Sequence, residues 1–250
     1  MSRRSAIDPR VERAHFEDVL ARRGALYWAE RTAAGRRRRD IRSGMLLAAA
    51  ALDGRARSRV LDVGCGTGHF TAALARHTSA LVVGIDIAPV LVAHAGGEVP
   101  SNARVASADI ERLPFKAGAF DVVVGNAVLH HLRLDRALPE LLRILAPGGR
   151  FCFTEPNMLN PQVFLERNVR WIGRRLDNSP SETAFVRWRL EPTLRDYGLA
   201  DVRIRPFDFL YPLTPRPLIA AVERLGHVLE RMPLVAEIAG SLLITGRKAK

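Results

Sequence analysis

Short apolar runs alternate with helix-forming segments from residue 59 onwards, and this alternation limits the possible folds more than any other feature of the sequence. The runs lie at 59–63, 81–85, 103–106, 120–125 and 150–154. Strands that are apolar along their length belong to sheets with both faces covered. The pattern therefore predicts an α/β fold, with a doubly wound, mainly parallel sheet and helices on both faces. Among the helices that it predicts between the runs are 71–77 and 134–145.

The pattern becomes sparser after Thr154. A helix with Pro192 in its first turn and Gly198 at its end is predicted next, followed by strands at 202–209 and 238–245. Because no βαβ crossover separates these two strands, the last one can lie antiparallel. Between them, apolar residues at alternating spacings of four and three predict one apolar helix face, formed by Leu218, Val222, Leu225, Leu229 and Met232.

We expect a helical segment at residues 1–52 and a main unit at 53–250, with insertions at about 156–188 and 210–235. Both insertions leave the carboxyl edge of the sheet, where they can form a lid with an apolar interior. The residues expected to line it are Phe164, Trp171, Phe207, Phe209, Tyr211, Leu218, Val222 and Leu225. Four arginines of the first insertion either hold an acidic head group or form a solvated helix face: Arg167, Arg170, Arg174 and Arg175.

The net charge of +12 is concentrated near the N-terminus, since residues 1–58 hold fourteen arginines and seven acidic residues. A basic arm that makes peripheral contact with acidic lipid, or binds a phosphorylated substrate, would explain this excess. Codon usage in a GC-rich genome would explain it equally, because lysine occurs at only three positions. The charge alone does not favour nucleic acid as a partner.

The sequence shows no export or membrane signal. Its longest wholly apolar run, residues 45–52, is far shorter than the roughly 20 residues of a membrane-spanning helix, and the N-terminus lacks the apolar core of a secretory signal. Two cysteines, Cys65 and Cys152, cannot form a disulfide framework or a four-cysteine zinc site. We therefore expect a cytoplasmic protein.

The run at 59–63 leads directly into three glycines, Gly64, Gly66 and Gly68. Glycines at this spacing allow a tight turn and let a ligand approach bare backbone. A dinucleotide-binding fingerprint would need its last glycine at the position of His69, which weakens a hydride-transfer interpretation. Asp62, just before the glycines, adds a negative charge that suits a cationic ligand and would repel a pyrophosphate.

Two further acids follow the next two strands. Asp86 ends the run at 81–85 and can accept hydrogen bonds from both hydroxyls of a ribose. Asp109 follows the run at 103–106 and can accept an adenine amino proton, with Ile87 and Ile110 as apolar plates for the ring. Acids at the ends of three successive strands indicate a nucleoside site at the carboxyl edge.

These segments together resemble the class I S-adenosylmethionine-dependent methyltransferases. The resemblance covers about residues 45–155 and rests on VLDVGCGTG at 60–68, VGIDI at 83–87, ADIERLPF at 108–115, FDVVV at 120–124 and LAPGGR at 145–150. LPF and VLHHL at 128–132 look most like the subgroup that acts on quinones, sterols, lipids and small metabolites. The resemblance implies a Rossmann-like sheet of seven strands with the last antiparallel, and S-adenosylmethionine as cofactor.

The resemblance also implies roles for single residues. Asp62 and the three glycines at 64, 66 and 68 would hold the methionine and sulfonium end, and Asp86 would hold the ribose. Asp109 and Ile110 would hold the adenine, beside Ile87. Asn126, just past the fourth strand, would lie next to the reacting methyl.

A base for the acceptor is the remaining requirement. His130 and His131 follow the fourth strand and Glu155 ends the fifth, so all three are predicted to reach the carboxyl edge, with His130 or His131 preferred as base. A packing role for the histidines stays open. We find no further cluster of acids and amides for a catalytic metal, and therefore predict none.

The acceptor is expected to be a hydrophobic small metabolite or lipid, methylated on an O, N or C atom. Asn126 is followed by Ala-Val-Leu rather than by the two prolines and aromatic residue common in enzymes that methylate nucleic-acid amines. The alternatives are an RNA or protein methyltransferase that uses the basic N-terminal segment, and a cofactor-binding regulator without methyl transfer.

Overall fold

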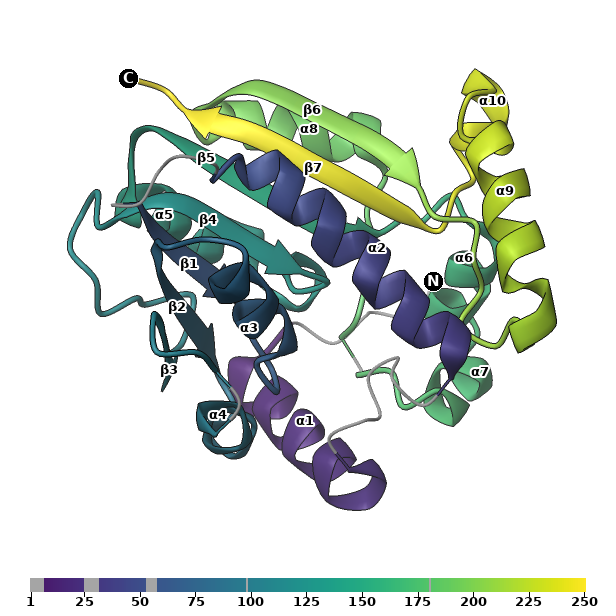
Figure 1. Ribbon diagram of the computed structural model, residues 1–250, viewed down its shortest axis with the longest axis horizontal. Coiled ribbons are helices and arrows are strands. Elements are labelled where there is room, and N and C mark those ends of the chain that lie inside the picture. The colour runs from purple at the N-terminus through teal and green to yellow at the C-terminus, as the bar shows by residue number, and fades with distance from the viewer. Residues whose placement is uncertain (1–6, 25–31, 53–57, 98, 180) are drawn as a thin grey trace.

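A seven-stranded sheet forms the centre of the computed structural model (Figure 1), with strand order β3-β2-β1-β4-β5-β7-β6. β7 runs in the opposite direction to the other six strands of this sheet. The strands are β1 (Arg59–Val63), β2 (Leu81–Asp86), β3 (Ala103–Ser107), β4 (Phe120–Asn126), β5 (Leu145–Pro156), β6 (Leu199–Phe207) and β7 (Ser241–Lys248). The structure describes residues 7–24, 32–52, 58–97, 99–179 and 181–250.

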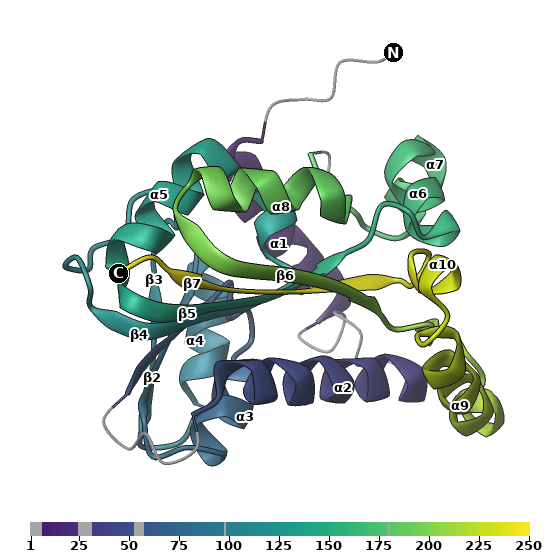
Figure 2. The ribbon, with the colours of Figure 1, turned by 90° about the horizontal axis from the view of Figure 1, so that it is seen from above.

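Helices cover both faces of this sheet: α5 and α8 lie on one face, and α2 and α3 on the other (Figure 2). The helices are α1 (Pro9–Arg23), α2 (Ala33–Ala50), α3 (His69–Arg76), α4 (Pro89–Gly96), α5 (Leu134–Ile144), α6 (Pro161–Asn168), α7 (Arg170–Arg175), α8 (Arg187–Asp196), α9 (Ile219–Leu229) and α10 (Pro233–Ala236), with short turns η1 (Leu129–His131) and η2 (Arg216–Leu218). None of the helices in the described ranges combines the length and hydrophobicity needed to cross a bilayer.

Each face of the sheet has its own apolar core. Leu138 and Leu141 of α5 and Leu194 of α8 belong to the larger core, and Leu46 of α2 and Leu74 of α3 to the smaller one. All five are fully buried, and each such side chain stabilises the fold by about 1.5–3 kcal/mol relative to exposure. The sheet is thereby a rigid platform for the loops at its carboxyl edge.

The predicted fold class is confirmed, and every predicted strand is present, that at 59–63 with the predicted bounds and the others with one or both ends moved. The predicted helix 134–145 corresponds to α5. The predicted helix with Pro192 in its first turn is wrong in its start: α8 begins at Arg187, so Pro192 lies inside it. Leu190 and Leu194 are both buried one turn apart, and their packing compensates for the backbone hydrogen bond that proline cannot donate.

The predicted apolar face of the second insertion is also wrong in its orientation. Leu218, Leu225 and Met232 are each about half exposed. The polar side of α9 faces the protein instead, because Arg37 of α2 pairs with Glu223 and Glu230 accepts the Asp208 N–H at 2.9 Å. These polar contacts turn the apolar residues of α9 towards solvent.

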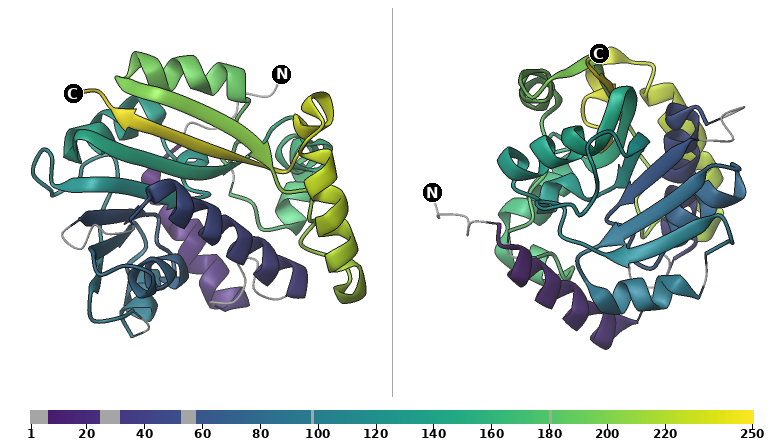
Figure 3. Two further views of the ribbon diagram at one scale, coloured as in Figure 1. Left: turned by 45° about the horizontal axis from the view of Figure 1, so that its top comes forward. Right: turned by 90° about the vertical axis from the view of Figure 1, so that its left-hand side faces the viewer.

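The N-terminal segment is divided between two layers. Helix α2 packs on the sheet, whereas α1 lies beyond the carboxyl ends of β1 and β2 (Figures 1 and 3). Within residues 1–52, residues 1–6 and 25–31 lie outside the described part of the chain. The first expected insertion contains α6 and α7, and the second contains η2, α9 and α10.

Candidate active site

The three glycines after β1 form a turn with positive φ angles of 70°, 52° and 82°. A Cβ atom on Gly64 would lie 2.5 Å from Val128 Cγ2, and one on Gly68 would lie 2.7 Å from Ala95 Cβ. Beside Gly66 no atom lies within 4 Å of that position. Packing therefore requires glycine at 64 and 68, whereas Gly66 presents bare backbone to open space where a ligand can approach.

Two buried carboxylates flank this turn. Asp62 accepts a hydrogen bond from Thr71 Oγ1 at 2.6 Å, and burial raises the pKa of Asp62 to about 7. Asp86 accepts the N–H groups of Gly66 and Ala88, both at 2.9 Å, one on each carboxylate oxygen. Because each oxygen keeps a second lone pair, Asp86 can still accept two hydroxyl groups.

A cavity of about 860 Å³ opens at the carboxyl edge of the sheet, beside these carboxylates. The structure brings eight of the nine predicted cofactor residues to its wall: Asp62, Gly64, Gly66, Asp86, Ile87, Asp109, Ile110 and Asn126. Gly68 does not line it and instead is the N-cap residue of α3. Asn126 accepts a hydrogen bond from Thr154 Oγ1 at 2.6 Å, which fixes its side chain.

The acceptor side of the cavity differs from the predicted lid. Of the eight expected lining residues, only Phe209 and Tyr211 line it. Phe207 is a core residue of β6, and Phe164 and Trp171 are exposed. The predicted lid interior is therefore wrong for most of its members. The apolar wall comes instead from Phe16, Val163, Leu176, Leu210 and Leu213.

Glu155 holds the backbone turn that carries both histidines. Its Oε1 accepts the N–H groups of Val128 and Leu129 at 3.0 and 2.8 Å, and its Oε2 lies 2.6 Å from Nδ1 of His130. The side chain is buried and does not line the cavity. Its geometry fits a positioning residue for His130 rather than a group that touches an acceptor.

His131 lines the cavity, and its partner is Glu12 of α1. Nδ1 of His131 lies 2.9 Å from Glu12 Oε2, and Glu12 also accepts hydrogen bonds from the hydroxyls of Ser179 and Ser181. Burial by itself raises the pKa of Glu12, but these hydrogen bonds outweigh burial and lower it. The carboxylate is therefore ionised, and Nδ1 of His131 is the donor of the hydrogen bond between them. Nε2 of His131 therefore carries the lone pair. Burial and the neighbouring His130 lower the pKa of His131, which favours the neutral ring.

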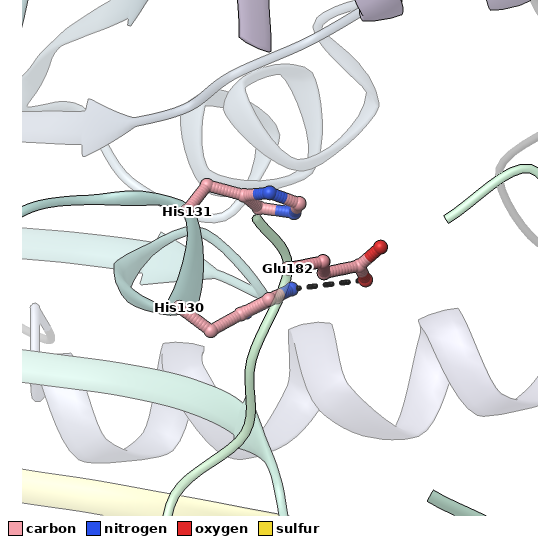
Figure 4. Close-up of side chains that lie close together, drawn as sticks. All are labelled: His130, His131 and Glu182. Atoms are coloured by element: carbon pink, nitrogen blue, oxygen red, sulfur yellow. Dashed lines mark ion pairs between the residues drawn. The ribbon is translucent and has the colours of Figure 1, made fainter. Parts of the chain in front are cut away.

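His130 lies between two carboxylates, of which Figure 4 shows that of Glu182. Its Nε2 is 3.4 Å from Glu182 Oε1, while its Nδ1 faces Glu155. Burial lowers the pKa of His130, but the two carboxylates outweigh burial and raise it. Arg167 Nη2 lies 2.5 Å from the same Glu182 oxygen. Both nitrogens of His130 are therefore engaged, and the two carboxylates favour its protonated form.

His130, His131 and Glu182 together could hold a metal ion, since their ligand atoms lie within 4.8 Å of one another. This set was not predicted from the sequence, since Glu182 lies about 50 residues beyond the two histidines. Arg167 already pairs with Glu182, so the charge of this carboxylate is balanced without a metal cation.

Comparisons with known proteins agree on the kind of domain. Residues 61–153 match a family model described as a methyltransferase domain. A malonyl-[acyl-carrier protein] O-methyltransferase of Herminiimonas arsenicoxydans is 42% identical over 99 residues, which is 38% of this chain and 36% of that protein. A 2-phytyl-1,4-naphtoquinone methyltransferase of Thermosynechococcus vestitus is 29% identical over 196 residues, covering 74% and 78% of the two chains.

Solved methyltransferase structures share the fold of this chain. The solved structure of an S-adenosylmethionine-dependent methyltransferase of Thermotoga maritima superimposes with a TM-score of 0.66 at 18% identity, covering 94% of this chain and 99% of that one. Matches to further malonyl-[acyl-carrier protein] O-methyltransferases span only 38% to 54% of those proteins. The matched region contains the glycine turn, the acids at strand ends and the histidine turn. This chain therefore contains a methyltransferase domain at residues 61–153 and, over nearly its whole length, shares the fold of a solved S-adenosylmethionine-dependent methyltransferase.

Proposed function

We propose that this protein transfers the methyl group of S-adenosylmethionine to an O, N or C atom of a hydrophobic small metabolite or lipid. The observation that carries the proposal is one cavity with two kinds of group: the carboxylates Asp62 and Asp86, and the neutral ring of His131. Such a transfer needs groups that hold the methyl donor, and the two carboxylates can do this. It also needs a group that takes the proton of the acceptor, and the histidine ring can do this.

The residues of the cavity fit this cofactor. Asp62 is a buried carboxylate without an ionic partner among the described residues, so a cationic sulfur beside it would favour its ionised form. Gly66 leaves room for the amino acid end, and Asp86 can accept both ribose hydroxyls. When bound, the cofactor supplies an activated methyl group on a positively charged sulfur.

His131 is the residue that we assign as general base. Its ring lines the cavity, and the ionised Glu12 holds it in the tautomer with the lone pair on Nε2 and stabilises the imidazolium that forms. His130 is less suited to act as general base, because both of its nitrogens already face carboxylates. Glu155 then acts through His130 and the turn, as a positioning residue.

The acceptor side favours a molecule with an apolar body and an acidic group. Arg38 and Arg42 share the carboxylate of Asp208, at 2.8 and 3.3 Å, which leaves one positive charge in excess. Burial and the neighbouring Arg38 lower the pKa of Arg42 to about 10, which a nearby anion would relieve. By their names, curated relatives act on malonyl-[acyl-carrier protein] and trans-aconitate.

Calorimetry with S-adenosylmethionine tests the cofactor half of the proposal. We expect Asp86→Ala to weaken binding at least about tenfold, since two hydrogen bonds to a charged group are lost. Asp121→Ala is the matched control, because Asp121 pairs with Arg59 outside the cavity. Transfer of labelled methyl to an extract of small acids and lipids, with products read by mass spectrometry, tests the rest. No heat with the unaltered protein would overturn the assignment.

A further inference from the structure

The exposed apolar side chains of this protein are gathered in two segments, residues 161–176 and 211–238. These segments hold twelve of the seventeen large apolar side chains that are exposed in the described part of the chain. Figures 1 and 2 both place their helices, α6, α7, α9 and α10, at one end of the molecule. We name their exposed side chains the apolar-basic surface. An exposed patch of this kind indicates a binding surface rather than random exposure.

Helix α9 shows that this exposure is built into the fold. An ordinary surface helix turns its apolar side to the core, but α9 turns Glu223 and Glu230 inwards and leaves Leu225 and Val228 more than half exposed. Leu234, in the following α10, is 88% exposed. The protein thus anchors the polar side of this helix and presents the apolar side outwards.

The charges on the apolar-basic surface have one sign. Six arginines are exposed there, and none of them forms an ion pair within the described part of the chain: Arg170, Arg174, Arg175, Arg216, Arg224 and Arg231. The four acids of the same segments are half-buried and engaged. Glu223 pairs with Arg37, Glu237 with Arg187, Glu166 with Gln162, and Glu230 with the Asp208 backbone.

We propose that the apolar-basic surface docks the protein onto an anionic lipid bilayer. Apolar side chains that enter the interface, surrounded by arginines that bind lipid phosphates, are what such a surface requires. Trp171, which is 69% exposed, lies among Arg170, Arg174 and Arg175 on the short helix α7. A second protein copy fits less well, because six unpaired arginines would face another six.

The position of the cavity adds a reason for this docking. Leu176, Tyr211 and Leu213 line the cavity and are also exposed in the same segments. The cavity therefore opens at the apolar-basic surface, where a hydrophobic acceptor could pass from the bilayer to His131. The docking itself does not depend on the methyl-transfer proposal.

Flotation with lipid vesicles tests the inference. We expect the full chain to bind phosphatidylcholine vesicles with about 30% phosphatidylserine, and to bind pure phosphatidylcholine far less. Leu225→Asp with Leu234→Asp, and separately Arg170→Glu with Arg174→Glu, should each reduce binding about tenfold or more. Because all four side chains are exposed, the variants should keep the unaltered melting temperature.

The matched control is Val11→Asp with Val90→Asp, two equally exposed apolar residues on α1 and α4, which should leave vesicle binding unchanged. Equal binding to neutral and anionic vesicles, or equal loss in the control, would overturn the proposal. So would a dimer in solution that the Leu225→Asp and Leu234→Asp variant abolishes. Cofactor calorimetry on the same samples separates this outcome from failure of the proposed function.

Discussion

Asp62 is deeply buried, and its charge therefore depends on what occupies the cavity. Burial raises its pKa from the ordinary value of 3.8 to about 7, so the carboxyl is mostly protonated below pH 7 and ionised above it. A cationic cofactor binds the ionised form. We expect the affinity for S-adenosylmethionine to rise up to about tenfold between pH 6 and pH 8, with release of a proton on binding.

Calorimetry in buffers of different ionisation enthalpy measures both the affinity and the released proton. Asp62→Asn keeps the hydrogen bond with Thr71 but cannot ionise, so its affinity should be weak and independent of pH in this range. Asp121→Asn is the control and should show the same rise of cofactor affinity with pH as the unaltered protein. If the affinity of Asp62→Asn still rose with pH, the titration would belong to another group.

His131 and Glu12 give a second prediction at the scale of residues. If His131 takes the proton, His131→Ala should lower kcat by about 100-fold, with cofactor affinity unchanged. Because burial and His130 lower the pKa of His131, the acid limb of kcat should fall below pH 6.5. Glu12→Gln should cause a smaller loss of kcat and move the acid limb to lower pH, since the ring loses the ionised partner that raises its pKa.

His77→Ala is the control, because His77 is an exposed residue that follows the C-terminal end of α3, and its ring contacts the carbonyl of Ala73 rather than the cavity. Turnover of His131→Ala within a few fold of the unaltered protein would remove His131 as base. If the acid limb of kcat stayed in place in Glu12→Gln and in His131→Ala, the base would have to be sought elsewhere in the cavity.

At the scale of elements, the glycine turn ties the cofactor site to the histidine turn. Gly64→Ala combines a positive φ with a Cβ 2.5 Å from Val128, whose N–H is fixed by Glu155. We expect a loss of about 2–4 kcal/mol in the free energy of unfolding, measured by urea denaturation. Gly66→Ala has the positive φ without the clash, so it should lose only about 1 kcal/mol.

The double variant Gly64→Ala with Val128→Ala shows whether the clash is the cause. Removing the methyl groups of Val128 should restore part of the stability that Gly64→Ala loses. Equal losses for the two glycine variants, without rescue, would mean that backbone strain alone explains the requirement for glycine.

The elements also show where sequence patterns stop being sufficient. Strands and the acids at their ends were predictable, because apolar runs and strand ends depend on neighbouring residues. The position of Pro192 inside α8 and the outward apolar face of α9 could not be predicted in this way, since both depend on tertiary contacts. For α9 one such contact is the ion pair of Arg37 with Glu223. Glu12 gave no local signal, because its partner His131 lies 119 residues further along the chain.

At the scale of the whole molecule, α1 is part of the active site but not of either apolar core. No residue of α1 belongs to the two core clusters that cover the sheet. The helix is held at the cavity by side-chain contacts, among them Glu12 with His131, His15 with the carbonyl of Asp177 and Arg22 with the Asp177 carboxylate. Folding and catalysis should therefore depend on α1 to different extents.

Removal of residues 1–31 tests this separation, because Thr32 would still cap α2 through the Gly35 N–H. We expect the shortened protein to unfold cooperatively and to bind S-adenosylmethionine, since Asp62 and Asp86 remain on the sheet. Turnover should fall at least as far as in Glu12→Gln, because the shortened chain lacks both the partner of His131 and one wall of the cavity. Methyl transfer at an unaltered rate would show that α1 covers the site without taking part, and global unfolding would show that α1 supports the sheet after all.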